Sequence, residues 1–169
     1  QQPLMLMETQ EPVGSGSCGE SLSWAFYEDG ALVISGSGPM TDFPNSGGAP
    51  WFIYTINREI SQLYLPEGLT HIGNFAFESL KITQLTIPST VRSIGVLAFN
   101  GCKALMGEVV LPDSVESVGE YAFSRCENIT KIHLGAATEQ VALHNAFEYC
   151  NNLKAFSEDV SFLGAKAGF

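Results

Sequence analysis

Residues 93–102 read SIGVLAFNGC, and close variants of this phrase occur before and after it. The earlier copy is HIGNFAFESL at 71–80, and the later copy is SVGEYAFSRC at 117–126. The dipeptide Ala-Phe recurs at steps of 22, 24 and 24 residues, at Ala76-Phe77, Ala98-Phe99, Ala122-Phe123 and Ala146-Phe147. A fixed period of about 20 to 50 residues is the signature of a repeat protein, so this repetition decides the fold class.

Each repeat is expected to contain a short strand and a short helical turn. Residues 129–134, ITKIHL, alternate apolar and polar side chains as a strand does, and so do QLYLP at 62–66 and QLTIP at 84–88. Within SIGVLAFNGC, Ile94, Ala98 and Cys102 recur every four residues, which indicates one face of a helical turn. Stacked in order, such units form an α/β repeat solenoid with a parallel sheet on one side.

The chain divides into four parts on this interpretation. Residues 1–17 are expected to be a flexible N-terminus, and residues 18–61 an N-terminal β-hairpin cap that turns at Asp29-Gly30 and includes Trp51. Residues 62–157 hold four repeats. Residues 158–169 are either a C-terminal cap or a truncated fifth repeat.

The wording of the repeats resembles a known family. IPSTVRSIGVLAFNGC at 87–102 and LPDSVESVGEYAFSRC at 111–126 are similar to the BspA-type (Treponema pallidum-like) leucine-rich repeat of bacterial surface proteins. The resemblance covers about residues 62–157, although the asparagine ladder of other leucine-rich repeats is absent. It implies a leucine-rich repeat solenoid, secreted or at the cell surface with any signal peptide removed, that acts in recognition or adhesion.

The repeated side chains are predicted to form the core. Phe99 and its equivalents should stack as a column, and Gly95 should allow a close approach or a tight turn. The cysteines at 102, 126 and 150 share one repeat position. Stacked at about 4.8 Å, they are farther apart than the about 3.8 Å Cβ separation of a disulfide, so they are expected to be buried thiols.

Composition excludes several functions. A formal net charge of −10 with only eight Lys and Arg argues against a nucleic acid or an anionic membrane surface as partner. No apolar run approaches the about 20 residues of a membrane span. His71, His133 and His144 have no serine or cysteine at motif spacing, and no paired zinc ligands occur. A non-enzymatic protein without cofactor or metal is therefore expected.

Candidate binding residues lie on the outward face of the predicted strands. These are Tyr64, Thr86, Val110 and His133, flanked by Gln62, Gln84, Glu108 and Lys131. Solenoids bind through such faces. The resemblance to the BspA-type family implies a protein or glycan ligand on a host cell or matrix. Four strands span about 19 Å, so this row alone offers less area than the about 800 Å² per partner of a standard interface. Binding through it would be weak, multivalent or shared with further repeats. The alternatives are an ordinary polar exterior, a spacer that displays another module, and an accessory domain of a secreted enzyme.

Overall fold

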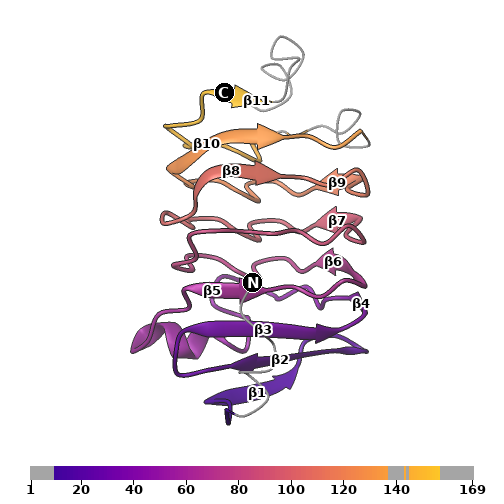
Figure 1. Cartoon of the computed structure of the whole chain (residues 1–169), viewed down its shortest axis with the longest axis vertical. Coiled ribbons are helices and arrows are strands. Elements are labelled where there is room, and N and C mark those ends of the chain that lie inside the picture. Colours follow the sequence, from indigo (N-terminus) through magenta and orange to yellow (C-terminus); the bar gives the residue numbers. More distant parts are fainter. Residues whose placement is uncertain (1–9, 137–142, 144, 157–169) are drawn as a thin grey trace.

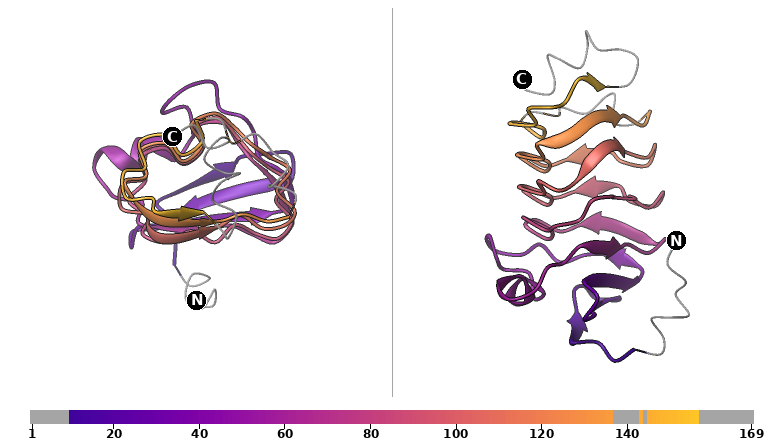
Figure 2. Two further views of the ribbon diagram at one scale, coloured as in Figure 1. Left: turned by 90° about the horizontal axis from the view of Figure 1, so that it is seen from above. Right: turned by 60° about the vertical axis from the view of Figure 1, so that its left-hand side comes forward.

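The computed structural model describes residues 10–136, 143 and 145–156 of the chain. Over these residues the chain winds into coils that stack along one axis (Figure 1), and seen from above the coils overlie one another (Figure 2). The described strands are β1 (Gly14–Ser17), β2 (Leu22–Phe26), β3 (Ala31–Gly36), β4 (Gly38–Pro39), β5 (Gln62–Tyr64), β6 (Leu69–Ile72), β7 (Ser93–Ile94), β8 (Met106–Val110), β9 (Ser117–Val118), β10 (Asn128–His133) and β11 (Ala155–Phe156). One short 3-10 helix, η1, spans Phe52–Ile56.

The sheet at the N-terminal end has the order β1-β2-β3-β5. β2 and β3 run antiparallel, with Trp24 opposite Ile34, and β3 then pairs in parallel with β5. Residues 14–17, which the sequence interpretation assigned to a flexible N-terminus, instead form β1 and pair with β2. Trp24 is buried and meets Trp51 edge-on, so the apolar side of this sheet packs on the first coil.

Two parallel sheets run along the stack, one in the order β11-β10-β8 and the other in the order β4-β6-β7-β9. They occupy the left and right halves of Figure 1. The second sheet was not predicted, because Ile94 was interpreted as the start of a helical face. In the structure Ile72, Ile94 and Val118 are buried strand residues that lie opposite one another in register.

The segment around each Ala-Phe pair is a series of tight turns, so the prediction of a short helical piece is wrong. Leu97 and Gly101 have φ angles of 57° and 74°, and the neighbouring coils have left-handed residues at the same positions. Such residues interrupt a right-handed helix. The Phe99 N–H instead donates to Ala122 O in the next coil at 2.7 Å. Bonds between coils thus satisfy backbone groups that a helix would satisfy internally.

The predicted aromatic column is confirmed. Phe77, Phe99, Phe123 and Phe147 are buried, with successive ring centroids 5.5, 5.1 and 5.3 Å apart and the rings stacked. Trp51 extends the column at its N-terminal end, 5.4 Å from Phe77. Its Nε1 donates to Ala76 O at 2.8 Å, which gives this buried indole its hydrogen-bond partner.

The glycine of each repeat phrase lies against the backbone of the neighbouring coil. A Cβ on Gly95 would come within 2.5 Å of Asn74 N, and one on Gly119 within 2.5 Å of Val96 N. Real Cβ atoms essentially never approach other atoms closer than 3.0 Å. The predicted close approach is therefore confirmed, and it lets successive coils stack closely at these positions.

The strand expected at residues 84–88 is not part of any sheet. No backbone hydrogen bond joins residues 61–67 to residues 82–88, all of which the structure describes. Toward β8, the segment makes a single backbone hydrogen bond, from Met106 N–H to Thr83 O. The expected row of four paired strands is therefore wrong at this coil, and on the left side of Figure 1 the segment between β5 and β8 carries no arrow.

A candidate recognition groove on the sheet face

The unpaired coil leaves a groove beside β5, with a volume of about 530 Å³. It is lined by Ser61, Gln62, Leu63, Tyr64, Leu65, Thr83, Gln84 and Thr86. None of these residues is charged, although the chain carries a formal net charge of −10. The volume falls within the range of small-molecule sites, about 300 to 1,000 Å³. The groove is therefore an uncharged cavity of ligand size, lined by both polar and apolar side chains.

One missing residue explains why the segment does not pair with β5. A single residue, Lys81, separates Leu80 from Ile82, whereas two residues separate the equivalent Cys102 and Leu105. A strand advances by about 3.3 Å per residue, so the shorter connection brings the chain back to the sheet too early. Lys81 N–H consequently makes the bond to the preceding coil, at 2.9 Å, and residues 82–88 make none.

β8 contains one residue more than the segment beside it. Three residues separate Leu105 from Val109, whereas two separate Ile82 from Leu85. Gly107 accommodates the extra residue with a φ of 77°, which favours glycine. An insertion of this kind is a β-bulge. β10 has the same two-residue spacing as 82–85 and pairs with β8 across the insertion with a register shift, so the bulge alone does not prevent pairing.

The polar side chains of the groove are only partly engaged with the protein. Tyr64 Oη donates to Gln62 Oε1 at 2.8 Å. Within the described part of the chain, the side chains of Thr83, Gln84 and Thr86 form no hydrogen bond with a protein group. Burial and the nearby Asp29 raise the pKa of Tyr64, so its phenol is a neutral donor at physiological pH.

The structure brings two of the four predicted binding residues together. Tyr64 and Thr86 both line the groove, with their predicted neighbours Gln62 and Gln84. Val110 and His133 lie outside the groove, opposite each other on β8 and β10. The predicted row therefore divides into a groove and a separate Val110–His133 pair.

His133 of this pair also contacts Glu108 on β8. His133 Nε2 lies 2.6 Å from Glu108 Oε2. This hydrogen bond lowers the pKa of Glu108, as does the charge of Lys131. On β5, residues 83–87, β8 and β10, the charged side chains are Glu108, Lys131 and the titratable His133. The negative charge of the chain is thus carried elsewhere than on this face.

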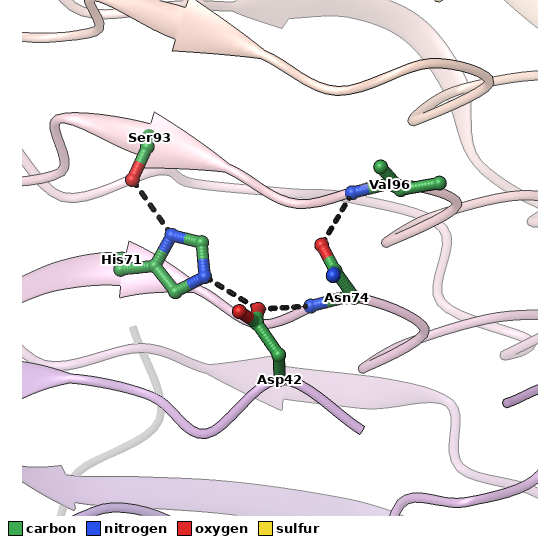
Figure 3. Close-up of polar contacts among 5 residues, drawn as sticks. All are labelled: Asp42, His71, Asn74, Ser93 and Val96. Atoms are coloured by element: carbon green, nitrogen blue, oxygen red, sulfur yellow. Dashed lines mark hydrogen bonds and ion pairs between the residues drawn. The ribbon is translucent and has the colours of Figure 1, made fainter. Parts of the chain in front are cut away.

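A second polar cluster joins Asp42, His71 and Ser93 (Figure 3). His71 Nδ1 lies 2.6 Å from Ser93 Oγ, and His71 Nε2 lies 2.7 Å from Asp42 Oδ1. Burial opposes ionisation of Asp42, but hydrogen bonds from His71 and the Asn74 N–H outweigh it and lower the pKa of Asp42. The sequence analysis missed this cluster, although the 22-residue repeat step from His71 to Ser93 could have revealed it.

The cluster combines the residue types of a hydrolytic triad, but its surroundings are structural. Acyl transfer needs N–H donors aimed at the developing oxyanion. The Asn74 N–H is bonded to Asp42 Oδ1, and the Val96 N–H is bonded to Asn74 Oδ1, so neither serves that purpose. The three residues come from three successive layers of the stack. Their contacts join the N-terminal region to the first two coils.

The cysteines are free and buried, as predicted. The Sγ atoms of Cys102, Cys126 and Cys150 each donate to a phenylalanine carbonyl of the preceding coil, at 3.1 to 3.2 Å. Burial raises the pKa of Cys18 and that of Cys150 to about 11, and a hydrogen bond with Cys102 together with burial raises the pKa of Cys126. Because the thiolate is the reactive form, these thiols are unreactive side chains of the core.

No group of three or more His, Cys, Asp or Glu side chains among the described residues is placed to hold a metal ion. In the same part of the chain, no helix has the length and apolar character needed to cross a membrane. His144 and the segment 158–169 lie outside the described residues.

Known structures share the fold of this chain. A leucine-rich repeat protein of Eubacterium ventriosum is 23% identical, with a TM-score of 0.50, over 75% of this chain and 45% of that protein. The Treponema pallidum leucine-rich repeat protein is 16% identical, with a TM-score of 0.51, over 83% of this chain and 81% of that protein. A leucine-rich cell surface protein of Faecalibacterium prausnitzii is 19% identical, with a TM-score of 0.49, over 90% of this chain and 42% of that protein.

Sequence comparison identifies the family. No curated protein matches the chain. The model of the BspA type leucine rich repeat region, which contains six copies, matches residues 52–165. This match covers more than half of the chain and agrees with the leucine-rich repeat fold of the two bacterial structures with TM-scores of 0.50 and 0.51. The chain therefore belongs to the BspA-type leucine-rich repeat family.

Proposed function

We propose that this protein is a non-enzymatic recognition or adhesion protein, secreted or at the cell surface, that binds a host or matrix macromolecule through the face formed by β5, residues 83–87, β8 and β10. The groove beside β5 carries the proposal, because an unpaired coil there exposes neutral polar groups. Leucine-rich repeat proteins commonly bind through an exposed face of the solenoid.

Exposed apolar side chains on the same face support the proposal. Met106 is 57% exposed and Val110 is 55% exposed, both on β8. Interfaces are depleted of charge and enriched in methionine and aromatic residues at their centre. The face offers Met106, Val110 and Tyr64, and its formal charges are confined to Glu108, Lys131 and a titratable His133.

The proposal includes the finer architecture. Residues 62–157 form four coils of a solenoid, and residues 18–61, with β1 added, cap its N-terminal end as a β-hairpin sheet. The pairing of β2 with β3 and the burial of Trp24 against Trp51 support the cap. The chain spans 45% of the length of the Eubacterium protein. The location follows from the resemblance to bacterial surface proteins.

A spacer that projects another module is the second candidate, and the uniaxial stacking of the coils favours it (Figure 2). The two candidates differ in what a face substitution does. A spacer tolerates any face substitution that preserves stability, whereas a recognition protein loses its ligand.

The deciding experiment measures attachment to immobilised extracellular-matrix proteins and to cultured host cells. The double variant Tyr64→Ala/His133→Ala should weaken attachment at an unchanged Tm. Arg92→Ala is the matched control, because Arg92 is exposed and lies beside β7 in the other sheet. Unchanged attachment of the double variant would refute the recognition face and leave the spacer.

A further inference from the structure

We propose that the groove between β5 and residues 83–86 binds a neutral sugar, namely the terminal unit or units of a glycan. This inference rests on the recognition role proposed above and names the ligand of one part of that face. The Val110–His133 pair on β8 and β10 is outside this site.

The side chains of the groove match the groups of a sugar. Each hydroxyl of a sugar both donates and accepts hydrogen bonds, and an amide side chain offers both functions on neighbouring atoms. Gln62 and Gln84 supply two amides, and Thr83 and Thr86 supply hydroxyls. The Tyr64 ring adds a flat surface on which the C–H groups of a sugar ring can pack.

The backbone adds further donors and acceptors at fixed positions. The N–H and C=O groups of residues 84–87 make no backbone hydrogen bond in the structure, and this stretch is fully described. The edge of the stretch that faces β5 lacks a strand partner, so the backbone polar groups on that edge can bind ligand hydroxyls. The coil already holds these backbone N–H and C=O groups in place, so a ligand can bond to them without the entropic cost of ordering a loop.

The shape of the groove favours a sugar over an extended peptide. Hydrogen bonds join the two coils at both ends, from Lys81 N–H to Ile60 O and from Gly68 N–H to Thr90 Oγ1, each at 2.9 Å. A peptide that adds as a strand must run along the groove past these bonds. A glycan end enters from the open face and needs no such passage, and about 530 Å³ suits a small ligand.

The charge of the site selects a neutral ligand. The groove has no Lys or Arg to pair with a carboxylate or sulfate, and the chain as a whole is acidic. An anionic sugar would meet long-range repulsion without a compensating ion pair. A neutral sugar meets no such repulsion and therefore needs no ion pair in the groove.

The test is an array of neutral oligosaccharides that end in galactose, mannose, fucose or N-acetylglucosamine, with sialylated and sulfated counterparts, followed by calorimetry on the full chain. We expect binding to at least one neutral oligosaccharide and weaker binding to its sialylated form. Gln84→Ala and Tyr64→Ala should each raise Kd by about tenfold or more. Gln84 is exposed, so we expect Gln84→Ala to fold as the unmodified protein does. The Tm of this variant checks that expectation.

Ile53→Ala is the matched control, because Ile53 is exposed on η1, outside the groove and outside the recognition face, and the Kd of this variant should stay within about twofold. Absence of neutral-sugar binding, or a Kd that Gln84→Ala and Tyr64→Ala leave unchanged, would overturn the sugar site. Groove-dependent binding of an extended peptide instead of a sugar would also overturn it. Failure of the sugar site and failure of the recognition role can be told apart by the attachment assay with matrix proteins and cells. If β8 and β10 bind the macromolecule, attachment persists although no sugar binds in the groove.

Discussion

Phe99→Ala removes one ring from the middle of the aromatic column. Phe99 is fully buried and stacks on Phe77 at 5.5 Å and on Phe123 at 5.1 Å. Burial and the resulting cavity make a Phe→Ala change cost about 3 to 5 kcal/mol. Two stacked aromatic pairs, each worth about 0.5 to 1.5 kcal/mol beyond the buried area, favour the upper part of that range. We therefore expect a loss of about 4 to 5 kcal/mol.

Urea unfolding followed by tryptophan fluorescence measures this loss, and the m-value shows whether the unfolding transition is unchanged. Ile53→Ala is the matched control, because Ile53 is 64% exposed on η1, and it should change stability by about 0.5 kcal/mol or less. A loss below about 2 kcal/mol for Phe99→Ala would refute the column as the main source of stability.

Three further predictions concern the cap, the polar cluster and the thiols. Trp51→Phe keeps an aromatic ring stacked on Phe77 but leaves the buried Ala76 O without its hydrogen-bond donor. The variant should therefore lose about 1 to 3 kcal/mol of unfolding free energy in urea. A loss near zero would contradict the stabilising role of this hydrogen bond. The pKa of Asp42 is lowered in the folded state, so its contribution to the free energy of unfolding is complete above the ordinary pKa of about 3.9 and is lost as pH falls through the folded pKa. Asp42→Asn should therefore have a lower Tm than the unmodified protein at pH 7 and the same Tm at pH 2. A Tm difference that does not change with pH would contradict this prediction. Burial raises the pKa of Cys150 to about 11, so an aromatic disulfide reagent at pH 8 should label it only after unfolding, and rapid labelling of the native protein is inconsistent with a buried thiol.

The core could be predicted because each of its features is a repeated residue. Four copies of Ala-Phe at nearly equal steps place one ring in each coil, and neighbouring rings then have to meet. The turns could not be predicted from apolar spacing, because Ile94, Ala98 and Cys102 recur every four residues in the turns as they would in a helix. What distinguishes the two is the left-handed backbone of Leu97, a residue that rarely takes this conformation.

The groove depends on differences between repeats, which an analysis of their similarity overlooks. One residue fewer separates Leu80 from Ile82, and one more separates Leu105 from Val109, than in the neighbouring repeats. The first difference brings the chain back to the sheet too early to pair with β5. Both length differences are visible in the sequence, but their effect on hydrogen bonding requires the positions of both neighbouring coils. Tyr64 and Thr86 both line the groove, because the alternation expected of a strand also holds in the unpaired coil.

Hydrogen exchange of the backbone amides tests the central claim, that one coil of the sheet is unpaired and opens a binding groove. The amides of Leu85 and Thr86 make no hydrogen bond to the backbone, whereas β10 is held between β8 and β11. We expect the amides of 84–87 to exchange rapidly in the free protein while those of the β10 ladder are protected, since protection follows hydrogen bonding and local stability. Protection of residues 84–87 equal to that of β10 would contradict the account.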